Sequence, residues 1–287
     1  MSSAVLVTGS SSGIGRAVVQ RLVRVPRLTV FASARRMSSI ADLGEAGARL
    51  LELDVTDEVS MRAAVDAVEA AHGAVGILVN NAGFGAYGTI EETDLDLVRG
   101  QFETNVFGLA RLTQLVLPGM RAAGGGRIVN IGSMGGRMAF PVAGYYHASK
   151  HALEAMSDAL RFEVRPFGVR VSLIEPGPVR TGFGEIVSKT LASTPVDSPY
   201  AALVRVADEQ RAHSFASKLI GLDADAVAEV LEDLVISENP PPRVVVGAVT
   251  KFLVQLRRLM GSRVFDAFLR RQHRGAKNWG RPVIVDA

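Results

Sequence analysis

Two adjacent tyrosines and a lysine stand in the stretch GYYHASK, residues 144–150. Residues four apart share one face of a helix, so Tyr146 is expected beside Lys150, and Tyr145 beside Ser149. A free phenol has a pKa of about 10 and is a weak acid or base at neutral pH, but a neighbouring ammonium favours the phenolate. Tyr146 and Lys150 are therefore a candidate acid–base pair. The alternative is a helix on which the two side chains merely share a face.

A glycine-rich stretch, TGSSSGIG at residues 8–15, follows an apolar run and opens a helical pattern. Gly9, Gly13 and Gly15 would allow a tight turn and a close approach of the backbone to a pyrophosphate, which the N-terminus of the helix would face. The spacing is G-x-x-x-G-x-G, which differs from the usual G-x-G-x-x-G. The alternative is a purely structural turn.

The elements that would hold these residues alternate between strands and helices. Continuous apolar runs predict strands at 4–8, 28–34, 49–54, 76–80, 126–132, 170–176 and 243–248. Such runs are typical of strands that are covered on both faces. Helical patterns between them predict right-handed βαβ units. The expected fold class is α/β: a Rossmann-type, doubly wound parallel sheet with helices on both faces, in a single domain.

The composition excludes several kinds of protein. The chain has 287 residues, of which 48% are hydrophobic and 21% charged, and it has no cysteine, so disulfides and thiolate chemistry are excluded. No apolar run approaches the roughly 20 residues of a membrane-spanning helix. The first predicted strand begins at Ala4, so no signal peptide is expected. A cytoplasmic protein is the resulting expectation.

Several motifs in order resemble the short-chain dehydrogenase/reductase family from about residue 4 to about residue 182. The motifs are TGSSSGIG (8–15), DV (54–55), NNAG (80–83), Asn105, Ser133, YHASK (146–150) and PGPVRT (176–181). The later part is similar to members that act on steroids, retinoids and other apolar carbonyl compounds. The resemblance implies a cofactor-binding and catalytic core at 4–182, a substrate-lid insertion at 182–240, and a last strand with a C-terminal helical segment at 243–287.

The resemblance also implies roles for four residues in the conversion of an apolar ketone or aldehyde to its alcohol, or the reverse. Tyr146 would be the general acid or base, while Tyr145 would pack or line the pocket. Lys150 would lower the pKa of Tyr146 and bind the nicotinamide ribose. Ser133 would bind the substrate oxygen. Asn105 would bend a long helix and hold a water that links Lys150 to solvent.

The resemblance implies a cofactor site, and one loop indicates that the cofactor is NADP(H). The implied contacts are Gly9, Ser11, Ser12, Gly13, Ile14, Gly15, Asp54, Val55, Asn81, Ala82, Gly83, Pro176, Gly177, Val179 and Thr181, with Tyr146 and Lys150. Where NAD-binding members usually carry an acidic residue, this chain has Ala34, followed by Arg35 and Arg36. Arg35 is expected to bind the 2′-phosphate through its guanidinium, with hydroxyl donors from Ser12 and Ser33.

Two histidines, His147 and His151, are four apart and could ligate a metal. No third ligand stands at metal spacing, so no metal is expected, and both histidines are predicted to face away from the side chains of Tyr146 and Lys150. The substrate pocket is expected to be apolar. Its candidate residues are Phe84, Tyr87, Met134, Met138, Phe140 and Phe183. Few residues of these segments could pair with a charged substrate, and Arg137 is the exception. Ordinary loop packing is the alternative for these side chains.

Residues 251–277 form a basic segment with eight Lys or Arg against one Asp. Phe252, Leu256, Met260, Val264 and Phe268 recur every four residues within it. We expect this stripe to cover the pocket or a subunit interface of a homo-oligomer, and contact with an anionic membrane is the less favoured alternative. Nucleic-acid binding is not expected, because interleaved stacking aromatics are lacking.

The alternative function is a catalytically silent, dinucleotide-sensing or scaffolding protein of the same fold. Such proteins usually lack the tyrosine or the lysine. Here Asn105, Ser133, Tyr146 and Lys150 are all present, so an enzyme is the favoured interpretation.

Overall fold

The computed structural model describes residues 3–195 and 197–276. Seven parallel strands form one sheet in the order β3-β2-β1-β4-β5-β6-β9. The strands are β1 (Ala4–Val7), β2 (Thr29–Ala34), β3 (Arg49–Glu52), β4 (Ile77–Asn80), β5 (Gly126–Ile131), β6 (Val169–Pro176) and β9 (Arg243–Val246). The predicted strands and the parallel, doubly wound sheet are therefore confirmed. The strand order reverses between β1 and β4, where sheets of this kind bind ligands at their carboxyl ends.

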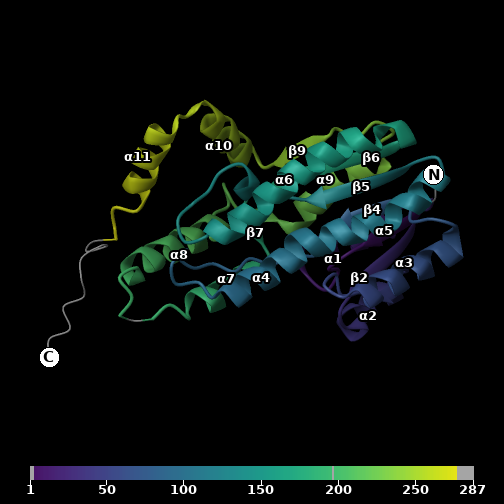
Figure 1. The fold of residues 1–287 in the computed structure, drawn as a ribbon, viewed down its shortest axis with the longest axis horizontal. Helices are drawn as coiled ribbons and strands as arrows, with labels where there is room; N and C mark the ends of the chain where they lie inside the picture. Colours follow the sequence, from purple (N-terminus) through teal and green to yellow (C-terminus); the bar gives the residue numbers. More distant parts are fainter. Residues whose placement is uncertain (1–2, 196, 277–287) are drawn as a thin grey trace.

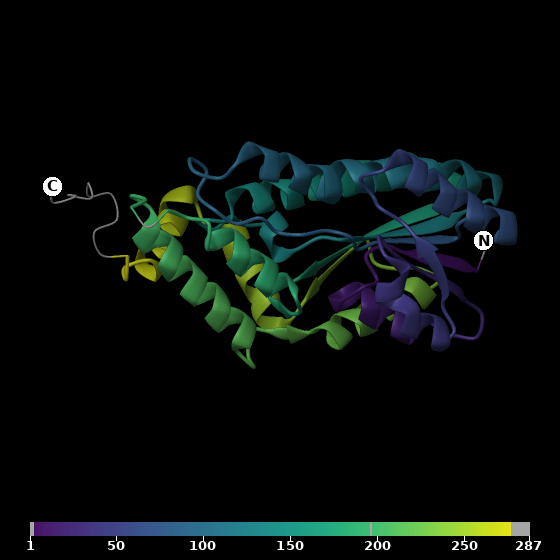
Figure 2. The same cartoon turned by 90° about the horizontal axis from the view of Figure 1, so that it is seen from below.

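Helices cover both faces of the sheet (Figure 2). One layer contains α3 (Glu58–His72), α5 (Leu109–Ala122) and α6 (Gly144–Val164), and the other contains α1 (Gly13–Leu22), α2 (Ala41–Glu45) and α9 (Ala224–Ile236). In β1, Leu6 packs in the core beneath α3 and α5, whereas Val5 and Val7 pack in the core beneath α1 and α9. The central strands β1 and β4 are buried at every position, as expected for strands covered on both faces, whereas the edge strand β3 exposes Arg49 and Glu52.

The long helix that the sequence predicts around Asn105 is interrupted. It consists of α4 (Leu95–Phe102), a π-helical turn at Glu103–Gly108 and α5. Single π-helical turns inside helices widen the backbone locally and often lie at functional sites. The turn brings Asn105 into the molecule, where its side chain is 1% exposed.

The segment after β6 does not form one unit. Its elements are β7 (Val179–Arg180), α7 (Phe183–Leu191), α8 (Ala201–Ala216), β8 (Leu222–Asp223) and α9. Helices α7 and α8 lie beyond the end of the sheet (Figure 1), whereas α9 packs on α1 through Val227, Leu231 and Leu234. The segment 182–240, expected as a lid, therefore contributes α7 and α8 beyond the sheet and α9 to the sheet's own cover.

The basic C-terminal segment forms two helices, α10 (Ala248–Leu259) and α11 (Ser262–Gln272), which stand apart from the sheet beside α8 (Figure 1). The chain turns between them at Met260 and Gly261. Residues 277–287 of the expected C-terminal segment lie outside the described residues. Among the residues that are described, no helix is long and apolar enough to cross a membrane.

Candidate active site

The glycine loop joins β1 to α1 and is held against the end of β4. Gly9 has a φ of +69°, which side chains with a Cβ rarely adopt. A Cβ on Gly15 would lie 2.3 Å from Asn81 Nδ2 and 2.5 Å from the Gly9 carbonyl oxygen. Asn81 Nδ2 donates to the Thr8 carbonyl at 2.9 Å, which fixes the loop to β4. Glycine at positions 9 and 15 therefore lets the loop pack closely against itself and against the end of β4.

The N-terminus of α1 is suited to a negatively charged group. Ser12 is the N-cap, but its side chain makes no capping hydrogen bond, and the first turn holds no acidic residue. The first N–H groups of a helix have no partner within the helix, and they attract phosphate. The loop and the helix together therefore fit the pyrophosphate of a dinucleotide, as the sequence predicts.

The region after β2 agrees only in part with the expected 2′-phosphate site. Ala34 ends β2, and Arg35 and Arg36 follow it exposed, whereas the nearby Arg16 is already paired with Asp42 at 2.5 Å. The expectation for Ser33 is wrong. Its side chain is fully buried and its hydroxyl donates to the Val7 carbonyl at 2.9 Å, because the side chain faces the sheet interior.

The carboxylate of Asp54 accepts from the Thr56 backbone N–H at 2.9 Å and from the Thr56 hydroxyl at 2.8 Å. These bonds hold the turn after β3 at the same edge of the sheet as the glycine loop. Thr8 Oγ1 accepts from the backbone N–H groups of Asn81 and Ala82, at 3.0 and 2.9 Å. The groups expected near the adenine and its ribose are thus ordered by the protein's own hydrogen bonds.

Tyr146 lies in the first turns of α6 and is 9% exposed. Its ring lies 5.6 Å from that of Tyr87 and 5.5 Å from that of Phe183. Burial in this apolar setting raises the pKa of the Tyr146 phenol, and the Ser133 hydroxyl partly opposes the rise. The shift is opposite to the lowering that the sequence predicts from Lys150, because desolvation of the phenolate outweighs the neighbouring groups.

Lys150 is buried one turn further along α6. Its ammonium donates to the Ile131 carbonyl at 2.9 Å, at the end of β5. Burial lowers the pKa of Lys150 to about 8, and the negative charge of Glu154 opposes this shift. The lysine therefore can lose or gain a proton close to neutral pH.

Asn105 and Ser133 are held by the backbone of neighbouring loops. The Asn105 carboxamide donates to the Phe84 carbonyl at 2.9 Å and accepts from the Phe84 N–H at 3.0 Å. Its Nδ2 also donates to the Ser149 hydroxyl at 3.1 Å. Ser133 caps the short helical turn after β5, and its hydroxyl accepts from the Gly135 N–H at 3.0 Å. Both side chains are thus fixed in place before any ligand binds.

A cavity of about 1200 Å³ brings the two candidate sites together. Gly9, Ser12, Gly13, Ile14, Asn81, Gly83, Pro176, Gly177, Val179 and Thr181 border it on the glycine-loop side, with Ser133, Tyr146 and Lys150 beside them. The expected pocket residues Phe84, Tyr87, Met134, Met138, Phe140 and Phe183 also line it. Ser11, Gly15, Arg35, Asp54, Val55, Ala82 and Asn105 are not among its lining residues, and the last of these lies behind the cavity wall.

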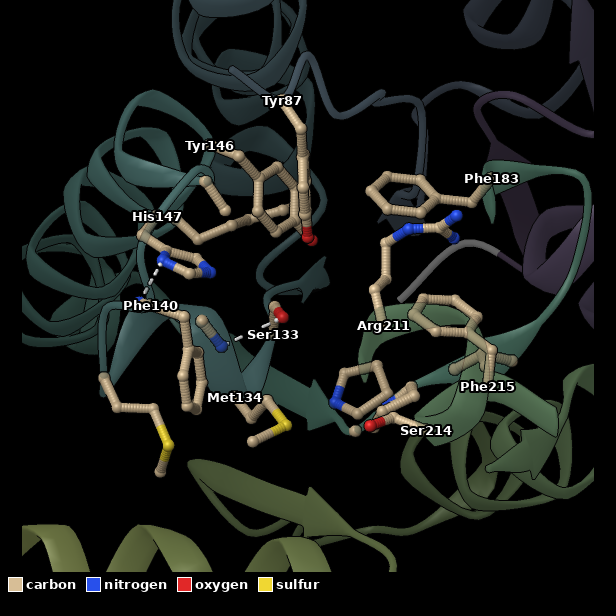
Figure 3. A pocket seen from close by; sticks show the side chains of 18 of the residues that line it. Tyr87, Ser133, Met134, Phe140, Tyr146, His147, Phe183, Arg211, Ser214 and Phe215 are labelled. Atoms are coloured by element: carbon tan, nitrogen blue, oxygen red, sulfur yellow. Dashed lines mark hydrogen bonds between the residues drawn. The ribbon is translucent and has the colours of Figure 1, made fainter. Parts of the chain in front are cut away.

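Arg137 and His147 differ from expectation, whereas Tyr145 takes the first of its two expected roles and packs outside the cavity. Tyr145 borders a separate shallow groove, and its hydroxyl donates to the Ile90 carbonyl at 3.1 Å. Arg137 lies 3.4 Å from the Glu175 carboxylate and does not border the cavity. His147 was expected to face away from the site, but its ring lines the cavity beside Tyr146 (Figure 3). Among the described residues there is no group of three side chains that could hold a metal.

The sequence indicated that the segment 182–222 would contribute to the pocket, but it did not single out the side chains of α8 that reach the cavity. Arg211, Ser214 and Phe215 point into it from α8 (Figure 3), and Leu256, Met260 and Phe268 line it from α10, the following turn and α11. The four-residue period of the basic segment had indicated a buried face. It did not indicate which half of the stripe would be buried, and Phe252 and Val264 are 64% and 56% exposed.

Known proteins share this arrangement. The family model described as short chain dehydrogenase matches residues 3–192. This chain belongs to the short-chain dehydrogenase/reductase family. The dehydrogenase is 37% identical over 271 residues to the uncharacterized oxidoreductase YbbO of Escherichia coli, covering 94% of each chain. It is 34% identical to the 3-ketodihydrosphingosine reductase of Bacteroides thetaiotaomicron, covering 87% of this chain and 89% of the relative.

Solved structures agree with this assignment. A short-chain dehydrogenase from Streptomyces avermitilis matches with a TM-score of 0.78 at 33% identity, covering 96% of this dehydrogenase and 97% of the other chain. A family member from Burkholderia phymatum in complex with NAD matches with a TM-score of 0.76 at 27% identity, covering 89% and 92%. The dehydrogenase is therefore an oxidoreductase of the nicotinamide-dependent type.

Proposed function

We propose that this oxidoreductase uses NADP(H) to interconvert an apolar ketone or aldehyde and its alcohol. One observation carries the proposal: a single cavity joins the glycine loop to the Tyr146 phenol and the Ser133 hydroxyl, and its remaining lining is mostly apolar. Ligand sites of this kind place a few polar groups in a largely apolar lining.

When bound, the nicotinamide supplies or accepts the hydride. In the reductive direction Tyr146 donates its phenolic proton to the carbonyl oxygen. Burial raises the pKa of Tyr146, so the phenol carries this proton at neutral pH before the hydride is transferred. Ser133 binds the same oxygen, where negative charge develops.

Lys150 and Asn105 support the proton transfer from behind the cavity. Lys150, whose pKa is lowered to about 8, is poised to hold the proton that replaces the one lost from Tyr146. Asn105, fixed by Phe84 and Ser149, orders the backbone beside Lys150 and holds a water that leads to solvent. Lys150 also binds the nicotinamide ribose.

The cofactor contacts follow the same assignment. The pyrophosphate lies on Gly9, Ser11, Ser12, Gly13, Ile14 and Gly15, the adenosine contacts Asp54, Val55, Asn81, Ala82 and Gly83, and the nicotinamide contacts Pro176, Gly177, Val179 and Thr181. Arg35 binds the 2′-phosphate. Its exposure at the end of β2 and the small side chain of Ala34 support NADP(H).

We also infer a homo-oligomer. Leu95 and Phe107 are 53% and 55% exposed, and with Tyr145 they border an apolar groove on the outer side of α4. Light scattering behind a sizing column measures the oligomeric state, and a monomer at micromolar concentration would contradict the inference.

The test of the function is NADPH consumption, followed at the absorbance band of the reduced nicotinamide. A panel of steroid, retinoid and aliphatic carbonyl compounds is offered, and we expect turnover with the apolar members. Cofactor binding without turnover on any panel member would instead support the dinucleotide-sensing alternative.

A further inference from the structure

His147 is enclosed between two aromatic rings at the wall of the cavity. Its side chain is 4% exposed, and its ring lies 5.7 Å from that of Tyr146 and 5.8 Å from that of Phe140. The loop before α6 folds over the first turn of the helix, and Val142 in this loop has a φ of +67°, which a β-branched residue rarely adopts. The surrounding packing therefore holds the ring in one position.

The hydrogen bond of the ring determines its tautomer. The Phe140 backbone N–H donates to His147 Nδ1 at 3.0 Å. An acceptor nitrogen carries no proton, so the neutral ring carries its proton on Nε2. Burial lowers the pKa of His147 to about 4, which agrees with a neutral ring at physiological pH.

The remaining N–H is directed into the cavity. Figure 3 shows the ring with one nitrogen bonded toward Phe140 and the other facing the open space beside Ser133. Among residues 3–195 and 197–276, Nε2 donates to no protein atom, and it is open to the cavity that His147 lines. Nε2–H is therefore a donor that a ligand in the cavity can use, and an oxygen atom is its usual partner in proteins.

That N–H and the Ser133 hydroxyl border the same small space. The point where a Cβ on Gly135 would lie is 3.2 Å from His147 Nε2 and 3.4 Å from Ser133 Oγ. The same point is 2.7 Å from His147 Cδ2, so a side chain at position 135 would displace the ring. The glycine leaves both polar atoms open to one ligand.

We propose that His147 Nε2–H binds a second oxygen of the substrate, separated from the reacting carbonyl by only a few bonds. The substrate is then a ketone with an oxygen acceptor on the second carbon from its carbonyl carbon, as in a 3-oxo ester. Its apolar chain lies in the rest of the cavity. This rests on the proposed function, because it deepens the assignment of the same site.

Two substitutions separate the donor from the acceptor of the ring. His147→Asn places a carboxamide oxygen near the position of Nδ1 and keeps the bond from the Phe140 N–H, but it removes the donor in the cavity. His147→Gln reaches the position of Nε2 and keeps a donor there. The probes are ethyl 3-oxodecanoate and decan-2-one, with NADPH as the reductant.

We expect the unmutated enzyme to prefer the keto ester by kcat/KM. The preference should fall about tenfold or more in His147→Asn, as for a lost hydrogen bond to a buried group, and should be largely retained in His147→Gln. If both variants lower kcat/KM for the two ketones equally, the role of His147 is structural and the inference is wrong.

Binding of the alcohol products tests the role of His147 independently of turnover. Calorimetry with the NADP⁺-loaded protein compares ethyl 3-hydroxydecanoate with decan-2-ol. Tighter binding of the hydroxy ester that is lost in His147→Asn supports the inference, and equal binding overturns it. Failure of every carbonyl compound to consume NADPH would sink the proposed function alone, since the binding comparison would still stand.

Discussion

The cavity has two sides that are lined by different kinds of groups. One side faces the glycine loop, and the other faces α7, α8, α10 and α11. On the first side, backbone groups and short polar side chains at the ends of β1, β4, β5 and β6 lie in place by hydrogen bonds, such as Asn81 to Thr8 and Lys150 to Ile131. On the second side, large apolar side chains from separate helices form most of the wall, among them Phe183 and Phe268, with Arg211 and Ser214 between them.

The contrast indicates how each side responds to change. Hydrogen-bonded groups at strand ends have one productive position, so altering one of them removes chemistry or cofactor binding. Apolar walls tolerate substitution and change mainly which substrates fit. The expected effects of mutation therefore decrease from the first side to the second.

The largest effect is expected for Tyr146→Phe. This change keeps the ring between Tyr87 and Phe183 but removes the proton, so kcat should fall by roughly 10²- to 10⁴-fold while NADPH still binds. Steady-state kinetics measures kcat, and titration with NADPH measures cofactor binding. Tyr145→Phe is the matched control, since it loses only a bond to the Ile90 carbonyl. The reverse result would assign the chemistry to Tyr145.

A stability effect is expected for Lys150→Met. The folded pKa of Lys150 is about 8, against a usual value of 10.5, so between these pH values the unfolded chain binds more protons and stability rises with pH. The variant removes this buried charge and should be more stable than the parent by about 2 kcal/mol below pH 8. Its advantage should shrink toward pH 10.5. Urea unfolding at pH 7 and pH 10 tests this, and an advantage that grows with pH would contradict it.

Cofactor choice should respond by a smaller factor. Arg35→Ala should weaken NADPH by about 10- to 100-fold, because a charge-assisted phosphate contact is lost, and leave NADH unchanged. Ala34→Asp should move the preference toward NADH. Both are measured by titration at fixed ionic strength. Preference of the unmutated protein for NADH, or equal weakening of both cofactors by Arg35→Ala, would refute the assignment.

On the substrate side, Phe268→Ala should lower kcat/KM for apolar ketones by about tenfold, which corresponds to the loss of one large apolar contact. The dissociation constant of NADPH should not change. Phe252→Ala on the same pair of helices is the control, because Phe252 is 64% exposed and does not border the cavity. Equal effects of the two variants would mean that α11 does not contact substrate.

The smallest effect is expected at membranes. Leu256, Met260 and Phe268 line the cavity, which leaves Phe252 and Val264 as the exposed apolar part of the basic stripe. We therefore expect the protein to remain in the supernatant when anionic vesicles are sedimented at low salt. Binding under those conditions would show that the exposed part suffices for membrane contact.

Much of the first side could be predicted because it depends on local rules. The seven strands were found from apolar runs, and the glycine loop from its place between a strand and a helix. Less could be predicted where a side chain has two choices of direction. Ser33 was expected near the cofactor, yet it faces the sheet interior and bonds to Val7, a choice that only the pairing of β1 with β2 makes.

By itself, the sequence determined the order of the elements, the open turn before α1 and the shared helical face of Tyr146 and Lys150. These follow from periodicity and backbone sterics within a few residues. Only the tertiary structure decided the π-helical turn at Asn105, the position of His147 in the cavity and the direction of the pKa shift of Tyr146. Each depends on burial by segments distant in the sequence, and burial exists only once the chain has closed on itself.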